Sequence, residues 1–378
     1  MACVASCNQQ AVCKTVGADG HAYVHIDEDK CIGCLKCEKV CTEAHALAGC
    51  NVPESSRPYA AWANNMEMRA ASTSGGFAAA VSRWIVSSGG SVAGVSFDGR
   101  HASHVLVSSE AQLPQLQGSK YVWSDASSVY SAIESALPLG KVLFVGTGCQ
   151  VAGVLAYFSG NRFRDNLYTV DLICGGVPSD LLMQAFFGMH PEIEKICSFR
   201  SKDKYELKAS EGGKEFVLPS DALPIAGFRG EQTMRHSCYD CPFARAHRAS
   251  DITIGDLWGS AAPSCERRSG VSLVVVHSSK GAEMLSAADV SFEALEWKAF
   301  VPDNARLVYG HTPVTFLRRN LARNYQRMGG ERFSRVYSLT AAPADPFGFA
   351  ARVWIYALRK INRVKCSRAV NSFIDKCG

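Results

Sequence analysis

Four cysteines near the start of the sequence stand at the spacing C-x2-C-x2-C-x3-C, in the stretch CIGCLKCEKVC at residues 31–41. This spacing is typical of bacterial ferredoxins, in which the first three cysteines lie on one tight loop and, in two-cluster proteins, the fourth binds the other iron–sulfur cluster. Cys31, Cys34 and Cys37 therefore need a fourth thiolate from elsewhere, and Cys41 is only the nearest one.

A second source lies upstream in MACVASC, where Cys3 and Cys7 are separated by three residues. That is the spacing of the last two cysteines of such a run, so the chain begins inside a first, truncated motif. In this interpretation Cys7 completes the cluster on Cys31, Cys34 and Cys37. Only Cys3 and Cys41 then remain for a second cluster, with Cys13 and Cys50 as irregularly spaced substitutes.

The alternative is a single cluster on Cys31, Cys34, Cys37 and Cys41. It must account for Thr42, which stands where such a run usually has a proline. Both alternatives stay open at this point.

Four further cysteines occur beside expected strand ends: Cys149 in FVGTGCQ, Cys174 in DLICGGVP, and the C-x2-C pair Cys238 and Cys241 in RHSCYDCPFA. The carboxyl ends of strands line the binding crevice of an open α/β sheet. Cys149 would open a helix, where the helix dipole favours a thiolate. A structural zinc site fits this spacing equally well; the neighbouring ferredoxin-like run favours an iron–sulfur centre.

Alternating helix and strand patterns predict an α/β fold, with a mixed sheet and flanking helices, as the frame for these cysteines. We divide the chain into an iron–sulfur module at 1–50, a linker or extended crossing at 51–64, an α/β domain at 65–300 and a helical basic region at 301–378. The strands that we expect lie at 22–27, 91–97, 141–146, 167–174, 250–256 and 271–278, with short antiparallel strands in 195–220. The helices lie at 76–87, 127–137, 148–156, 179–190 and 349–373.

The composition excludes several classes of protein. Hydrophobic residues make up 47% of the 378 residues and charged residues 20%, as in ordinary globular domains. Sixteen cysteines without a secretory signal indicate metal or redox chemistry in a reducing cytoplasm rather than a disulfide framework. No apolar run reaches the roughly 18 to 20 residues that a membrane helix needs.

The basic charge is concentrated at the C-terminal end. From Arg318 onward there are 13 Lys and Arg against 3 Asp and Glu. We expect a helix at 349–373 that packs on the domain and leaves a solvated basic face. A contact with a membrane surface or with an acidic protein such as a ferredoxin is the sharper alternative. No motif for specific nucleic-acid recognition accompanies this charge.

Residues 65–300 resemble the beta subunits of coenzyme F420-reducing hydrogenase and dehydrogenase and their bacterial relatives. The motifs that carry the resemblance occur in the family's order: TSGGFAAAVSRWI, GSKYVWSD, LFVGTGCQVAG, DLICGGVPS, FRSKDK, HSCYDCPFA and SDITIGDLWG. The resemblance implies an FAD-binding α/β domain with an additional 4Fe-4S cluster on Cys149, Cys174, Cys238 and Cys241.

The resemblance also implies which residues contact the flavin. Ser74, Gly75 and Gly76 match the family's glycine-rich segment, which would open a helix and hold a pyrophosphate through backbone N–H groups. Lys120 and Tyr121 match a second stretch near the cofactor.

Two positions depart from the family's pattern: Gly148 replaces a usual proline and Gly175 a usual histidine. The substitution at Gly175 puts in doubt any proton transfer through that histidine. The remaining acid–base candidates are Asp171, Asp251 and Asp256, which can equally be structural caps. His236 can tune a cluster, although an exposed loop histidine is the simpler interpretation.

These features predict an oxidoreductase with two 4Fe-4S clusters and FAD. Electrons would pass between a ferredoxin-like partner, the clusters, FAD and a small organic substrate such as coenzyme F420. The alternatives are a non-enzymatic electron-transfer subunit, which would hold clusters without flavin, and a zinc-stapled binding module.

Overall fold

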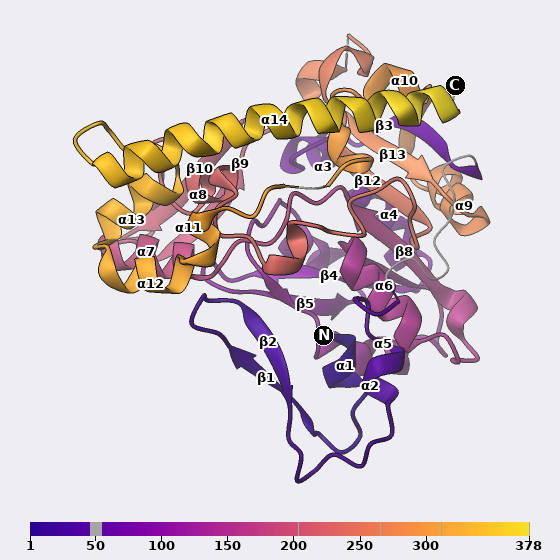
Figure 1. Ribbon diagram of the computed structural model, residues 1–378. Helices are drawn as coiled ribbons and strands as arrows, with labels where there is room; N and C mark the ends of the chain where they lie inside the picture. Colours follow the sequence, from indigo (N-terminus) through magenta and orange to yellow (C-terminus); the bar gives the residue numbers. More distant parts are fainter. Residues whose placement is uncertain (46–54, 203, 265, 311, 378) are drawn as a thin grey trace.

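The computed structural model describes residues 1–45, 55–202, 204–264, 266–310 and 312–377. Its centre is a mixed nine-stranded sheet with the strand order β14-β3-β13-β12-β8-β7-β4-β5-β6 (Figure 1). The strands are β3 (Arg57–Ala63), β4 (Ser91–Phe97), β5 (Ala102–Val107), β6 (Ser124–Asp125), β7 (Val142–Thr147), β8 (Leu167–Leu172), β12 (Ile252–Asp256), β13 (Ser272–Val276) and β14 (Val290–Ala294). The α/β prediction is confirmed.

The middle of this sheet is parallel. Strands β4, β7, β8 and β12 run in one direction, whereas β13, β3 and β14 continue the sheet antiparallel. All five residues of β13 are buried. Strands covered on both faces read as continuous apolar runs, which is why β13 and β7 are visible in the sequence.

Helices cover both faces of the sheet. On one face, α4 (Phe77–Ser87) and α9 (Ser279–Ala287) pack on side chains such as Leu143. On the other, α5 (Val129–Ala136) and α6 (Gly148–Tyr157) pack on Val142 and Phe144. Because neighbouring residues of a strand point to opposite faces, one strand such as β7 contributes to both cores.

A second core lies beside the sheet, around a three-stranded antiparallel sheet of order β11-β10-β9. Its strands are β9 (Lys195–Arg200), β10 (Tyr205–Glu211) and β11 (Lys214–Val217). Its helices are α7 (Leu181–Met189), α8 (Ile225–Gly230), α11 (Phe316–Arg319), α12 (Leu321–Arg327) and α13 (Gly330–Tyr337).

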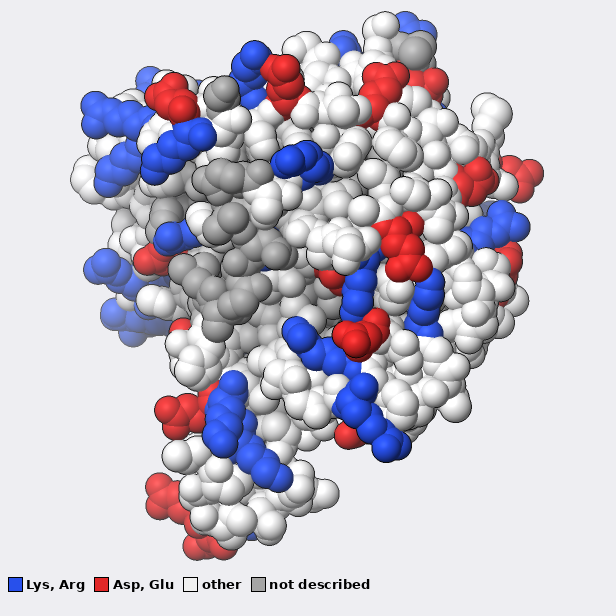
Figure 2. Space-filling model, turned by 90° about the vertical axis from the view of Figure 1, so that its right-hand side faces the viewer, with Lys and Arg blue, Asp and Glu red and all other residues white. Residues whose placement is uncertain are grey.

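The N-terminal module projects from the lower end of the molecule in both views (Figures 1 and 2). It consists of α1 (Ala2–Ala5), the hairpin β1 (Val12–Val16) with β2 (Ala22–Ile26), and α2 (Lys36–Lys39). On the face drawn in Figure 2, basic and acidic side chains are interspersed over both the module and the body.

The tip of the hairpin fastens the module to the second core. Asp19 accepts a charged hydrogen bond of 2.9 Å from Arg318, and His21 Nε2 lies 3.0 Å from the carbonyl oxygen of Thr233. The Asp180 N–H donates to the Gly20 carbonyl at 3.2 Å. The tip of the hairpin is therefore held by polar contacts, whereas Ala2 and Val40 at the other end of the module are buried in the apolar core beneath α5 and α6.

The C-terminal helix α14 (Pro346–Cys377) runs across the molecule as one long element, shown in yellow in Figure 1. Ala351 and Ile355 enter the second core, and Val370 packs with α10 (Trp297–Phe300) on the central sheet. The predicted helix at 349–373 is confirmed, and its packing joins the two cores.

The linker prediction for 51–64 is wrong for its second half. Residues 57–63 form β3, which lies inside the sheet between β13 and β14, and four of its seven residues are buried. This strand is rich in alanine, which has little intrinsic preference for strands, and its partners follow more than 200 residues later. Helix α3 (Met66–Ala71) comes next, capped by Asn65. Residues 51–54 and Cys50 lie outside the described residues.

Candidate functional site

Four cysteines that are far apart in sequence converge at the carboxyl ends of β7 and β8. Cys149 lies in the first turn of α6, which a capping box of Thr147 and Gln150 fixes to the end of β7. Cys174 follows β8, and Cys238 and Cys241 lie in the loop between α8 and β12. Each of the four thiol groups lies close enough to the other three to influence their ionisation.

Burial and this crowding govern the acidity of the thiols. Burial, reinforced by the neighbouring thiolates, raises the pKa of Cys174 to about 11 and that of Cys238 to about 12. The same causes raise the pKa of Cys241, whereas Cys149 is exposed. Without a cation at the centre these buried thiols stay protonated at neutral pH. A metal centre supplies that cation and takes thiolates as its ligands.

The surroundings of the four cysteines also suit an anionic group. The Cys174 sulfur accepts the Gly176 N–H at 3.3 Å, and the Cys149 sulfur lies 3.2 Å from the Thr147 hydroxyl. Arg248 interacts electrostatically with Cys241. The Arg248 side chain is 2% exposed, and its Nε and Nη2 atoms have no hydrogen-bond partner among the described residues.

The donor set therefore fits a four-thiolate metal centre, either a 4Fe-4S cluster or a tetrahedral zinc site. No group of three or more His, Cys, Asp or Glu side chains in the described parts of the chain has, as it stands, a geometry that could hold a metal ion. The thiols are gathered but not closed into a ligand shell.

The cysteines of the N-terminal module occupy one end of its hairpin. The Asp27 N–H donates to the Ala11 carbonyl at 2.8 Å and closes the hairpin, and the Cys31 N–H donates to the Asp27 carbonyl at 3.0 Å. The turn that begins at Cys7 and the loop that carries Cys31, Cys34 and Cys37 thus leave the hairpin together. Cys31 and Cys34 are exposed.

Cys7 and Cys41 differ in their surroundings. The Cys7 sulfur accepts the Ala11 N–H at 3.2 Å. Desolvation opposes ionisation of Cys7, but backbone N–H groups of the residues that follow outweigh it and lower its pKa. Cys41 instead interacts electrostatically with Cys3. Cys3 lies in α1 and Cys41 follows α2, and these two helices are in contact. This pairing is the one expected if Cys3 and Cys41 belong to a separate, truncated motif.

The two segments predicted to bind the flavin lie against each other. The Thr73 hydroxyl lies 3.0 Å from the Ser119 hydroxyl and joins the loop at 72–76 to the stretch that contains Lys120 and Tyr121. Gly76 has a φ of +84° and caps α4. The Gly75 N–H donates to the Ser272 hydroxyl at 3.1 Å, so the N–H groups open to a ligand begin after Gly75.

Cations surround this loop. Lys202 donates to the carbonyl oxygens of Ser74 and Ser269, at 3.3 and 2.8 Å, and also to that of Arg69. Burial and the nearby Arg69 lower the pKa of Lys202. Arg69 itself pairs with Glu266 at 2.6 Å. Glu266 balances the charge of Arg69, so the start of α4 combines a helix dipole with the positive charge of Lys202, which suits a phosphate group.

Arg200 is a central residue that the sequence interpretation did not single out. Its Nη1 lies 2.6 Å from Asp256 and 3.5 Å from the Tyr121 hydroxyl, and its Nη2 lies 3.4 Å from the Thr73 carbonyl. It joins four of the motifs that carry the family resemblance. Arg200 is the arginine of the FRSKDK motif, so the motif drew attention to this stretch. Spacing along the sequence could not show that its side chain contacts residues of three other motifs.

Lys120 and Tyr121 are both engaged within the protein. The Lys120 ammonium donates to the carbonyls of Leu116 and Gln117 at 2.7 Å each, and burial lowers its pKa to about 8. Tyr121 packs against Phe228 with ring centroids 4.5 Å apart, and burial raises its pKa to about 12. Lys120 thus shapes its loop, and Tyr121 is part of an aromatic wall.

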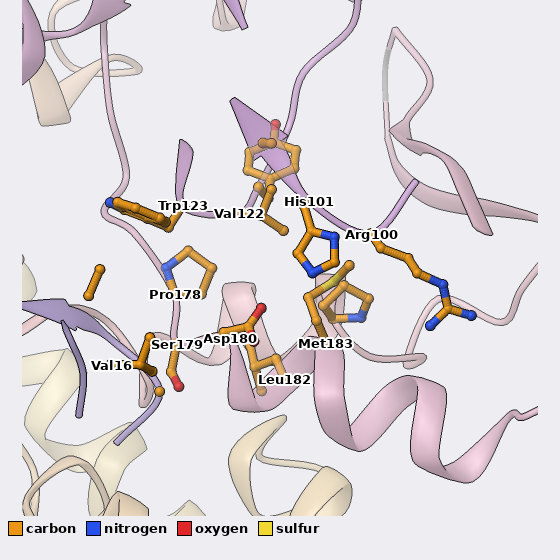
Figure 3. A pocket seen from close by; sticks show the side chains of 15 residues that line it. Val16, Arg100, His101, Val122, Trp123, Pro178, Ser179, Asp180, Leu182 and Met183 are labelled. Atoms are coloured by element: carbon orange, nitrogen blue, oxygen red, sulfur yellow. The ribbon is translucent and has the colours of Figure 1, made fainter. Parts of the chain in front are cut away.

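A cavity of about 300 Å³ lies between the hairpin and the body (Figure 3). Tyr121 is on its wall, but no cysteine of the described chain lines it. The Ser179 hydroxyl donates to the Asp19 carbonyl at 2.6 Å, and Arg100 is directed away from Trp123 toward the carbonyls of residues 193 and 194. The Ser179 contact holds the module on the body, whereas that of Arg100 lies within the body. The cavity is lined by residues of both parts and belongs to their junction rather than to the cysteine site.

Comparison with known proteins supports the same division of the chain. Residues 139–300 match a family described as the C terminus of the coenzyme F420 hydrogenase/dehydrogenase beta subunit. Because of this match we refer to residues 139–300 as the beta-subunit segment. Residues 23–47 match a 4Fe-4S binding domain. The two matches together place an iron–sulfur module and an oxidoreductase segment in one chain.

Among solved structures, the chain is similar to part of the xenon-derivatised F420-reducing NiFe hydrogenase complex from Methanosarcina barkeri. The identity is 18%, the TM-score is 0.46, and the match covers 75% of this chain and 91% of that chain. A search of curated proteins found no match. Within the described residues, every helix is too short or too polar to cross a membrane.

The beta-subunit segment contains all four converging cysteines, together with Arg200 and Arg248. It also contains the acid–base candidates, which have structural roles here. Asp171 pairs with Arg248, Asp256 pairs with Arg200, and Asp251 accepts hydrogen bonds from Thr169 and from the Ser278 hydroxyl. His236 is exposed, as the simpler interpretation predicted.

Proposed function

We propose that the chain is a cytoplasmic iron–sulfur flavoprotein oxidoreductase. It would pass electrons between ferredoxin-type 4Fe-4S clusters and FAD, and between FAD and a soluble organic acceptor such as coenzyme F420. The observation that carries the proposal is the mutual proximity of Cys149, Cys174, Cys238 and Cys241, which come from three separate parts of the beta-subunit segment.

In this proposal Cys7, Cys31, Cys34 and Cys37 hold a first cluster in the module, and the four converging cysteines hold a second in the α/β domain. A bound 4Fe-4S cluster supplies one-electron transfer, and bound FAD links it to two-electron chemistry. The protein supplies position and charge: Cys149 is fixed by the capping box of α6, and Arg248 places a buried positive charge beside the thiolates.

The flavin would lie at the loop of Ser74, Gly75 and Gly76, with its pyrophosphate at the start of α4. Lys202 supplies positive charge there, and Arg200 holds Thr73, Tyr121 and Asp256 in one arrangement. A buried, paired arginine keeps these segments from moving independently, so the loop is preorganised for its ligand.

An external ferredoxin-like protein would exchange electrons with the module. Cys31 and Cys34 are exposed on a part of the molecule that projects from the body (Figure 2), so a partner can approach the first cluster directly. The polar junction around Asp19 and Arg318 then fixes the module against the domain that carries the second set of cysteines.

The test is anaerobic purification followed by quantification of iron, sulfide, zinc and flavin on one sample. About eight irons and one FAD per chain support the proposal. Iron without flavin would instead indicate an electron-transfer subunit, and zinc without iron would indicate a zinc-stapled module.

Two serine variants distinguish a cysteine that binds the second cluster from one that does not. Cys241→Ser should lower the iron content by about four atoms, whereas Cys197→Ser, in β9 of the second core, should leave iron unchanged. Equal iron in both variants would rule out the second cluster at this site.

A further inference from the structure

Helix α14 has apolar side chains on two opposite faces. Ala351, Ile355 and Val370 are buried against the two cores. On the other side Trp354 is 57% exposed and Ile361 is 59% exposed. A helix that is apolar all round is normally buried on all sides, so the second face of α14 lacks the cover that its composition predicts.

The exposed apolar residues form a continuous stripe. Val353, Trp354, Ile361 and Val364 are each more than half exposed, and Tyr356 adjoins them at 51%. Their spacing of seven, eight and eleven residues keeps them on one side of a helix with 3.6 residues per turn. At a rise of about 1.5 Å per residue the stripe extends over roughly 17 Å, parallel to the molecular surface.

Basic side chains accompany the stripe. Over 346–377 the sequence has seven Lys and Arg against one acidic residue, Asp375. Lys360, Arg363, Lys365 and Arg368 are exposed, and none of them is in an ion pair within the described residues. Arg359, in contrast, donates to the Gly230 carbonyl at 2.7 Å and belongs to the packed face. The free positive charges are therefore on the side of the exposed apolar residues.

We propose that this face of α14 binds the surface of a bilayer that contains anionic phospholipids, with the helix lying in the plane of the interface. Interfacial helices combine a stripe of Trp and aliphatic residues with flanking Lys and Arg, whose stems lie along the apolar layer and whose charges reach the headgroups. The packed face keeps the helix parallel to the domain surface, which suits a planar partner.

The exposed apolar residues decide against an acidic protein as the occupant. An acidic docking partner steered by charge accounts for Lys360 and Lys365 but gives no reason for Trp354, Ile361 and Val364 to be in water. The exposed face of α14 is thus not only basic, as the sequence predicts, but also apolar. The proposal does not depend on the clusters or on the flavin.

The test is co-sedimentation of the full-length holoprotein with vesicles of neutral phosphatidylcholine, with and without phosphatidylglycerol. Binding should require the anionic lipid and weaken with salt. The variant I361E/V364E should abolish it, and K360Q/K365Q should weaken it about 30-fold, since each basic residue near an anionic surface is worth about a fivefold factor.

A matched control is S131E/S135E, which adds the same two charges to exposed positions of α5. It should bind anionic vesicles nearly as the unchanged protein does. The proposal is overturned if the protein fails to sediment with anionic vesicles, or if I361E/V364E and the control bind equally. It is also overturned if I361E/V364E only converts a dimer to a monomer, since the stripe is then a contact between copies of the chain.

Discussion

Arg248 and Asp171 form an ion pair inside the protein, with Nη1 3.3 Å from Oδ2 and both side chains 2% exposed. Asp171 ends a central strand, and Arg248 comes from the loop beyond the C-x2-C pair. The would-be Cβ of Gly148 lies 3.2 Å from the same Asp171 oxygen, so the residue before Cys149 rests directly on the pair.

Removing one member of this pair should be strongly destabilising. In Arg248→Gln the buried carboxyl of Asp171 loses its counter-charge, and we expect the free energy of unfolding to fall by about 3 kcal/mol. The measurement is urea unfolding under anaerobic conditions. The double variant R248Q/D171N should recover much of the loss, because no buried charge is then left alone; a double variant as unstable as R248Q would contradict this account.

Arg248 should also influence the second cluster. Arg248 places a positive charge near Cys241, which favours the more negative, reduced form of a cluster bound there, so R248Q should lower the midpoint potential of that cluster. Arg248→Lys should restore most of the potential because it keeps the charge. Redox titration followed by electron paramagnetic resonance distinguishes the clusters. A midpoint that is the same in all three proteins would show that Arg248 has only a packing role.

Gly75 should not tolerate even one added methyl group. A Cβ there would lie 2.5 Å from the Ser272 nitrogen and 2.6 Å from the Ala61 carbonyl oxygen, and neither backbone atom can move without disrupting β13 or β3. We expect Gly75→Ala to destabilise the protein by about 3 kcal/mol and to reduce bound flavin. Gly188→Ala, whose added methyl group meets open space in α7, is the control. It should leave the flavin content unchanged and should not destabilise the protein, because alanine favours a helix more than glycine does.

The order of the cysteine variants tests which residue completes the first cluster. Cys7→Ser should remove about as much iron as Cys34→Ser, and Cys41→Ser should have little effect, because the Cys41 thiolate interacts with Cys3 instead. Iron analysis and the iron–sulfur charge-transfer absorption, at about 400 nm, give the ranking. The opposite order, with Cys41→Ser the more damaging, would restore Cys41 as the ligand.

The sequence predicted the elements better than their partners. The approach of Cys149 to Cys174 was visible because both follow parallel strands, whose carboxyl ends meet at one edge of a sheet. The ion pairs of Arg248 and Arg200 were not visible, since their acidic partners lie 77 and 56 residues away. Periodicity reports which face of an element is buried and not which distant element covers it.

The same limit explains β3 and α14. The strand at 57–63 has alanines where a typical strand has branched residues, so its position inside the sheet depends on contacts with β13 and β14 that no local pattern encodes. The helical period of α14 was clear, but a pattern with apolar residues on two sides does not state which side the protein covers.

Acidification should loosen the junction between the module and the body through His21. Burial, with Arg318 and Arg235 nearby, outweighs the attraction of Asp19 and lowers the pKa of His21 from 6.5 to about 4. The folded protein therefore holds His21 neutral, while the unfolded chain takes up a proton as soon as the pH falls below 6.5. Stability from this residue is fully present above pH 6.5 and is lost as the pH falls toward 4.

Between pH 7 and pH 5 this proton uptake should reduce the free energy of unfolding by about 2 kcal/mol. His21→Gln keeps a donor for the Thr233 carbonyl but cannot titrate, so its stability should fall less over the same range. His104 and His277, whose pKa values burial lowers to about 4 and about 3, contribute equally to both proteins. The measurement is urea unfolding of both proteins at pH 7, 6 and 5. Identical pH dependence in the two would show that His21 takes up its proton equally in the folded and the unfolded chain.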